Sequence, residues 1–335
     1  MQDPVVQIDH ALCQDPEASS SREWWLANGI GGYAAGTVSG VLTRRYHGLL
    51  IAPLHPPLGR SLLLAKADAV LLDGETETPL HVNQWLGGTY APEGQRRIDS
   101  FHLDGTLPVW RFGVDGLCIE QRVWMDHGRN QTWVAFRWTR GERDAPPRLR
   151  VGLLASLRDH HAVNRLHGFH LGREPLPDGC RLHLPEGRFL DVRSASGRFA
   201  PDDTWIEGFY LARERERGLE DVDHHLRVGF VEVPLARDAW VGLGIGLDGL
   251  HDADLASSLG KERERVAARQ SQALPGVDRA AVPGWVRQLV GAADGYVFER
   301  LEPGGRRRLS VIAGYPWFGD WGRDTMIALP GLCLA

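Results

Sequence analysis

Short apolar runs separated by Gly, Pro, Asp and Asn recur along the chain from residue 21 to about residue 250. The run at 132–138 mixes apolar and charged positions, as an antiparallel strand with one buried face does. Because no helical segments separate these runs, the pattern favours a sandwich of antiparallel sheets over alternating strands and helices. Strands are expected at 47–52, 61–72, 108–112, 118–125, 131–138, 148–154 and 240–247.

The pattern changes beyond residue 250. Residues 253–272 are charged, rich in helix formers and free of Pro, which predicts an exposed helix. Residues 281–301 place Trp285, Leu289 and Val297 at helical spacing, which predicts a second helix. The expected organisation is an irregular lead-in (1–20), a large antiparallel β-sandwich domain (21–250), linker helices (251–310) and the start of another domain (311–335).

Composition and charge exclude several classes of protein. A hydrophobic fraction of 43% and a charged fraction of 24% are ordinary for a soluble globular protein. No apolar stretch approaches the about 18 residues of a membrane-spanning helix, and the N-terminus lacks the pattern of a secretory signal. The net charge of −5 comes from interspersed acidic and basic residues, so neither nucleic acid nor an anionic membrane is expected as a partner.

The four cysteines, Cys13, Cys118, Cys180 and Cys333, lie far apart without a Cys-x-x-Cys spacing. This pattern is typical of reduced thiols in or near a core and not of a disulfide framework or a zinc site. A cytoplasmic location is therefore expected.

No nucleotide or metal site is expected. The glycine-rich segment 28–36 lacks the Gly-Lys-Ser/Thr of a phosphate loop and the βαβ setting of a dinucleotide fold, so its glycines are assigned to tight turns. The adjacent pairs His160-His161 and His224-His225 would point to opposite faces if they lie on strands, which makes them poor metal ligands.

The segment 313–331 packs aromatic residues around Asp320, Arg323 and Asp324. Flat apolar faces cover a sugar ring, while carboxylates and guanidinium groups fix hydroxyls through directional hydrogen bonds, so this composition suits a sugar subsite. The alternative is structural, because Asp324 would also cap a helix that starts there. Asp320 and Asp324 are four residues apart, and on one helix their Cβ atoms would lie about 5–6 Å apart on one face. That spacing favours binding over an acid and base pair, which in inverting glycosidases is about 6.5–9.5 Å apart.

Residues 314–326 resemble the motif that opens the catalytic domain in the glycogen debranching (amylo-alpha-1,6-glucosidase) family, and similar Trp-x-Arg-Asp motifs occur in glucoamylases. Residues 22–50 and 205–219 resemble the N-terminal β domain of the same family, and the three segments follow the family's order. The resemblance implies that Arg323 and Asp324 hold the terminal glucose and that Trp317 and Trp321 wall its pocket. Asp320 is also expected to bind substrate, because of its spacing from Asp324.

The resemblance implies a function as well. The chain would be the N-terminal portion of an enzyme that hydrolyses α-1,6-linked glucose at branch points of glycogen or limit dextrin, without a metal or an organic cofactor. Its last residues would be the truncated start of an α/α-toroid catalytic domain. The alternatives are another α/α-toroid glycosidase, such as a glucoamylase or trehalase, and a non-catalytic carbohydrate-binding sandwich.

No catalytic residue is assigned within the chain. In the resembled family the later helices of the toroid supply the general acid and base, so both are expected downstream of Ala335. The 335 residues alone are then expected to be inactive, with an apolar patch exposed at Ile327, Leu329 and Leu332.

Two charged segments remain open to a structural interpretation. Arg44, Arg45, Tyr46 and His47 precede an apolar strand, where they would reach the neighbouring domain or the pocket rim, or form an ion-paired strand end. The alternating Arg and Glu at 213–217 is expected on a solvated or ion-paired strand face, without a chemical role.

Overall fold

Two antiparallel sheets form the body of the molecule in the computed structural model, which describes residues 4–55, 58–251, 254–274, 276–278, 281–301 and 305–334. Every strand pair in both sheets is antiparallel over these residues, so the prediction of a mainly β antiparallel fold is confirmed. The first sheet has the order β1 (Gln7–Ile8), β9 (Ile98–Asp104), β10 (Leu107–Val114), β11 (Leu117–Met125), β12 (Gln131–Arg140), β19 (Val241–Leu247), β16 (Phe189–Arg193), β15 (Gly179–His183) and β14 (Gly172–Leu176).

The second sheet faces the first. Its order is β17 (Arg198–Tyr210), β18 (Val222–Pro234), β13 (Arg148–Asp159), β5 (Gly59–Asp73), β4 (Gly48–His55), β3 (Tyr33–Thr37) and β2 (Glu23–Ala27), with β6 (Thr76–Pro79) paired to β5. A small ribbon of β7 (Asn83–Gln84) and β8 (Tyr90–Ala91) and the 3-10 turns η1 (Gly94–Arg97) and η2 (Pro185–Gly187) complete the connections. All seven strands expected from the sequence are present.

The central strand β12 is buried on both faces, although its sequence predicts only one buried face. On the inner face, Thr132 donates a hydrogen bond of 2.6 Å to the Leu49 carbonyl of the opposite sheet. On the outer face, Trp124 and Trp133 stack with centroids 6.0 Å apart, and the Trp124 indole donates to Ser258 of helix α4 (Leu255–Ala273). Helix α4 therefore covers a face that the alternation alone assigns to solvent.

The lead-in is ordered, so its prediction as irregular is wrong for residues 7–20. Helices α1 (His10–Gln14) and α2 (Pro16–Ser20) begin after Asp9 and Asp15, whose carboxylates accept hydrogen bonds from the free amides of the first turns. Strand β1 adds to the edge of the first sheet. Cys13 on α1 is buried as a free thiol, as are Cys118 and Cys180, in agreement with the sequence, whereas the Cys333 side chain lies outside the described residues.

The second predicted helix is wrong over its last third. Helix α5 (Gly284–Asp294) ends before Gly295, and β20 (Val297–Leu301) then pairs with β21 (Arg307–Val311). Two tertiary contacts favour the strand: Phe298 is buried, and the Glu299 amide donates a hydrogen bond of 2.7 Å to the Gly29 carbonyl. Helix α6 (Gly322–Leu329) follows and continues into a π-helical turn (Pro330–Leu334).

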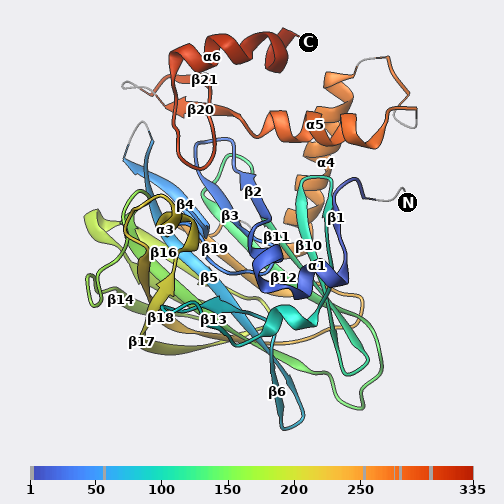
Figure 1. The fold of residues 1–335 in the computed structure, drawn as a ribbon, viewed down its shortest axis with the longest axis vertical. Helices are drawn as coiled ribbons and strands as arrows, with labels where there is room; N and C mark the ends of the chain where they lie inside the picture. Colours follow the sequence, from blue (N-terminus) through green and yellow to red (C-terminus); the bar gives the residue numbers. More distant parts are fainter. Residues whose placement is uncertain are drawn as a thin grey trace.

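Helices α5 and α6 and the β20–β21 hairpin lie together at one end of the sandwich, with α4 joining them to it (Figure 1). The remaining helix, α3 (Ala212–Glu216), occupies the segment of alternating Arg and Glu, so the prediction of a strand face there is wrong. None of the helices in the described ranges combines the length and the apolar character that crossing a bilayer requires.

Candidate functional site

A closed loop joins the β20–β21 hairpin to helix α6. Its two ends pair through an isolated bridge between Ile312 and Asp320, and the Ala313 amide donates to the Gly319 carbonyl at 2.9 Å. We call residues 313–321 the junction loop, because it carries the aromatic motif and leads directly into α6.

Tyr315 inserts the junction loop among aromatic side chains of the sandwich. Its ring stacks on Trp25 of β2 at 4.8 Å and meets the edge of Tyr33 of β3 at 5.5 Å. Tyr296, which precedes β20, contacts both Trp25 and Tyr315 at 5.1 and 5.9 Å. Burial raises the pKa of Tyr315 to about 12, so this phenol stays protonated near neutral pH.

Arg60 of β5 binds the junction loop to the second sheet. The residue is buried, its Nε donates to the Gly31 carbonyl at 2.8 Å, and its Nη1 donates to the Phe318 carbonyl at 3.0 Å. The guanidinium also lies over the ring of Tyr315 at 5.3 Å. The sequence analysis missed Arg60, because a single Arg in an apolar strand gives no local signal of a distant carbonyl partner.

Trp317 packs against the segment that precedes β4. The Arg44 guanidinium lies 4.9 Å from the centre of its ring, that of Arg217 lies 5.6 Å away, and Tyr46 meets the ring at 5.9 Å. The structure therefore brings together Trp317 and two of the residues predicted to reach the neighbouring domain. Through these contacts, Trp317 packs the junction loop against the β domain.

The same segment also forms the ion-paired strand end that was the alternative interpretation. Glu23 accepts from Arg44 Nε at 2.6 Å, and His47 Nε2 lies 3.4 Å from the same carboxylate oxygen. His47 Nδ1 accepts from the Thr43 amide at 3.1 Å, so the ring proton resides on Nε2 and points at Glu23. Burial alone would raise the pKa of Glu23, but His47 and Arg44 outweigh it and lower the pKa to about 2.

Arg45 connects this segment to helix α3. Its guanidinium donates to the His161 carbonyl and, at 3.0 Å, to the Glu220 carbonyl, and its Nε lies 3.4 Å from the fully buried Glu214 carboxylate. Glu214 also accepts from the Arg45 amide at 3.3 Å and pairs with Arg217. Glu214 is therefore ion-paired, as one of the two interpretations of this segment expects, but it lies on a helix and not on a strand.

The predicted glucose-binding residues lie in two places: Asp320 lies before helix α6, and Arg323 and Asp324 lie in its first turn. Asp320 precedes helix α6 and is ion-paired with Arg300 of β20 at 2.9 Å, so Asp320 and Asp324 do not lie on one helix. Asp324 lies in the first turn of α6, and the side chain of the N-cap residue, Trp321, makes no capping hydrogen bond. The Asp324 carboxylate lies 3.6 Å from the Arg323 guanidinium, whose side chain is 80% exposed.

The general acid and base have no predicted position within the chain, because the resemblance places them after Ala335. This expectation stays a prediction. Asp320 and Asp324 are the carboxylates that the described part of the aromatic motif provides.

Trp321 and the outer face of α6 are exposed. Trp321 is 55% exposed and meets only the edge of Phe318 among the ring contacts of the described residues, at 6.3 Å. Met326 and Ile327 are 69% and 74% exposed, as expected for Ile327, whereas Leu329 and Leu332 are half-buried. The exposed patch is therefore centred one turn earlier than the sequence predicts.

The two histidine pairs behave differently. His224 and His225 lie on β18, and only His225 is fully buried, as expected for opposite faces. His160 and His161 follow the end of β13, where their rings approach to 3.9 Å and offer ligand atoms within 4.8 Å of one another together with Asp159. The expectation of opposite faces is wrong for this pair, because the chain has left the strand.

The electrostatic surroundings of His160 do not favour a cation. Burial, together with His161 and Arg60, lowers the pKa of His160 to about 3. Its Nδ1 lies 3.2 Å from the Arg60 carbonyl, and the Arg45 guanidinium contacts the next residue. Two arginines thus lie beside the cluster, and Asp159 is its one carboxylate.

Comparison with known proteins identifies two profiles in order along the chain. Residues 22–241 match the glycogen debranching enzyme N-terminal profile, and residues 287–335 match the amylo-alpha-1,6-glucosidase profile. No curated protein matches the chain in sequence.

Two solved structures are similar to parts of the chain. A bacterial glucoamylase solved with acarbose has 7% identity and a TM-score of 0.38 over 83% of this chain. A candidate kojibiose phosphorylase from the human microbiome has 11% identity and a TM-score of 0.33, also over 83% of this chain. The matches cover 37% and 36% of those proteins, so the chain spans little more than a third of their length. On the profile that matches residues 22–241, the chain belongs to the glycogen debranching enzyme family.

Proposed function

We propose that the chain is the N-terminal portion of a glycogen debranching glucosidase that hydrolyses α-1,6-linked glucose at branch points of glycogen or limit dextrin. The observation that carries the proposal is the order of the two profiles, debranching N-terminal over 22–241 and amylo-alpha-1,6-glucosidase over 287–335. The junction loop supports it, because it belongs to the second region and docks on the first through Arg60 and Tyr315.

Arg323, Asp324 and Trp321 bind the terminal glucose in this proposal. Arg323 and Asp324 lie in the first turn of α6. The guanidinium can donate hydrogen bonds to sugar hydroxyls, and the carboxylate can accept hydrogen bonds from them. Trp321 presents an exposed indole face for the sugar ring. Asp320, held by Arg300, fixes the start of this turn, while Trp317 holds the loop to the sandwich.

The general acid and base are assigned elsewhere. Glycoside hydrolysis uses two carboxyl groups on opposite sides of the bond that breaks. Asp320 and Asp324 each lie beside an arginine. A neighbouring guanidinium favours the ionised carboxylate, which accepts hydrogen bonds and does not protonate a leaving group. We assign Asp324 to sugar binding and Asp320 to holding the start of α6, and we infer that the 335 residues by themselves release no glucose.

The buried free thiols Cys13, Cys118 and Cys180 support a reducing, cytoplasmic location for this activity. A branched α-glucan would be the partner there.

Linkage preference tests the proposed activity. The protein expressed from the complete reading frame is incubated with limit dextrin, linear maltoheptaose and trehalose, and released glucose is measured. Preferential release from limit dextrin is expected, whereas preference for maltoheptaose or trehalose would assign the chain to another glycosidase activity. Glucose release by residues 1–335 alone would overturn the assignment of the acid and base elsewhere.

A further inference from the structure

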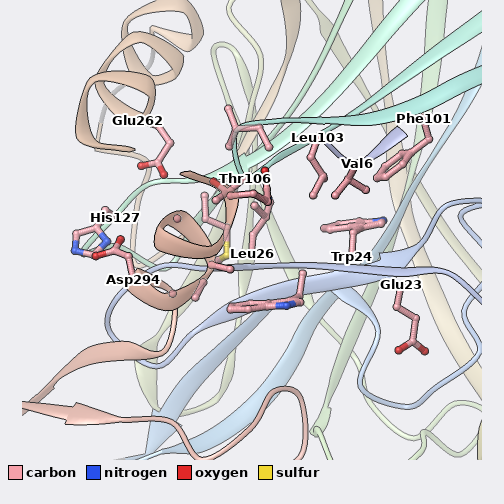
Figure 2. A pocket seen from close by; sticks show the side chains of 18 of the residues that line it. Val6, Glu23, Trp24, Leu26, Phe101, Leu103, Thr106, His127, Glu262 and Asp294 are labelled. Carbon is pink, nitrogen blue, oxygen red and sulfur yellow. The ribbon is translucent and has the colours of Figure 1, made fainter. Parts of the chain in front are cut away.

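A cavity of about 490 Å³ lies between strand β2, the β9–β10 turn and helices α4 and α5 (Figure 2). Its volume falls within the range of small-molecule sites, about 300–1,000 Å³. None of the described residues that line it comes from 313–334, so it is distinct from the Arg323–Asp324 pair. Two glycines allow α5 to approach the sandwich closely. A Cβ at Gly295 would lie 2.8 Å from the Trp25 ring, and one at Gly291 would lie 2.9 Å from Thr106.

One end of the cavity is polar and carries balanced charge. Glu262 accepts two hydrogen bonds from Arg265, at 2.8 and 2.9 Å, and Arg265 also donates to Asp294. Arg269 pairs with Asp294 at 3.3 Å, so two carboxylates face two guanidinium groups. A charged ligand would find no uncompensated charge there, whereas a neutral hydroxyl can donate to remaining carboxylate lone pairs.

His127 adds a neutral polar group to the same end, beside Glu262 and Asp294 (Figure 2). Burial lowers the pKa of His127, and the nearby Arg265 lowers it further. The imidazole is therefore neutral near pH 7 and offers one donor and one acceptor.

The other end is mainly apolar and aromatic, with Trp24, Phe101 and Leu103 on its wall (Figure 2). Arg22 and Glu23 also line the cavity, and their opposite charges keep the balance.

Trp25 lines the cavity as well. One face of Trp25 is taken by Tyr315, so the aromatic side chains offer the cavity apolar surface and not two open ring faces. Apolar surface at one end and hydrogen-bonding groups at the other suit a sugar ring, which has an apolar face and a rim of hydroxyls.

We propose that this cavity binds the end of an α-glucan chain, as a second carbohydrate site separate from the glucose site at α6. That the ligand is a neutral polyhydroxyl molecule follows from the lining; that it is an α-glucan rests on the proposed function.

Maltotriose binding tests the proposal, measured by calorimetry in the complete protein with Asp324→Asn present throughout to weaken the glucose site. Ala292 lines the cavity, and Ala292→Leu fills it, whereas the adjacent Ala293 lies outside the lining and Ala293→Leu is the matched control. We expect Ala292→Leu to weaken maltotriose binding at least about tenfold and Ala293→Leu to leave it unchanged. Should Ala292→Leu not fold, Gln288→Ala removes a polar lining group with the same expectation.

Equal affinity in the lining variant and the control, or no maltotriose binding at all, would overturn the site. Cellotriose binding as tight as that of maltotriose would overturn the α-glucan as its ligand. The site and the proposed activity fail separately, because a protein without glucose release from limit dextrin can still show cavity-dependent maltotriose binding.

Discussion

The buried guanidinium of Arg60 donates a hydrogen bond of 3.0 Å to the carbonyl of Phe318, which lies 258 residues later in the chain. This bond joins the central part of the β domain to the junction loop, which leads into the helix that carries Arg323 and Asp324. The position of those two side chains therefore depends on the sandwich as well as on their own helix.

Arg60→Met is expected to loosen the junction loop. The substitution leaves the Gly31 and Phe318 carbonyls without their donor, at a cost of about 1.5–3 kcal/mol for each hydrogen bond to a charged group. Urea unfolding should show the lower stability, and hydrogen exchange should show faster exchange at 313–321. Arg148→Met is the control, because Arg148 forms an exposed pair with Glu232 and should change stability by less than about 1 kcal/mol. Equal stability of the two variants would contradict the role of Arg60.

The two loop tryptophans should separate stability from binding. Trp317→Ala removes the contacts with Arg44, Arg217 and Tyr46 and should lower the free energy of unfolding by about 1–3 kcal/mol. Trp321→Ala should change it by less than about 0.5 kcal/mol, because the ring is exposed, while raising KM for limit dextrin. Thermal unfolding and steady-state kinetics of both variants check this, and a large stability loss for Trp321→Ala would contradict its assignment to substrate.

Glu23 should stabilise the fold at neutral pH and lose this effect in acid. Its pKa is about 2 in the folded protein against 4.5 for an unperturbed carboxyl group, so the unfolded chain binds the proton more tightly. The contribution is complete above pH 4.5 and disappears as the pH falls to about 2. Glu23→Gln should therefore be less stable than the parent at pH 7 and equally stable near pH 2. A constant difference across this range, measured by urea unfolding, would show that Glu23 acts through packing alone.

His160 should destabilise the fold progressively below neutral pH. Its pKa falls from 6.5 to about 3 on folding, so the unfolded chain takes up the proton first. Stability is then retained above pH 6.5 and lost as the pH falls toward 3. His160→Gln should flatten this part of the pH profile, with His170→Gln at an exposed position as the control, and identical slopes in the two variants would contradict the prediction.

The sequence predicts the sandwich well, because each strand carries its own apolar run and turn residues. The prediction fails where the apolar positions of one segment fit both the helical and the strand periodicity. Residues 297–301 continue a helical pattern, yet Phe298 and the Gly29 carbonyl select a strand. It also fails at 7–20, where the caps Asp9 and Asp15 precede helices too short for periodicity to reveal.

The candidate site is predicted only in part for a similar reason. Local motifs identify Trp317 and the segment with Arg44 and Tyr46, and the structure brings these together. Arg60 and Glu214 escape prediction, because their roles consist of contacts with residues far away in the sequence. Alternation along a strand indicates burial, and it does not identify the partner of a buried charge.

The central claim concerns the glucose site at the start of α6, and glucose release by Asp324→Asn tests it most directly. The variant is made in the protein expressed from the complete reading frame and assayed on limit dextrin, beside Asp144→Asn at an exposed position. We expect Asp324→Asn to lower kcat/KM at least about 100-fold, because a hydroxyl of the bound glucose loses its charged acceptor, and Asp144→Asn to leave it unchanged. Near-normal glucose release by Asp324→Asn would contradict the account.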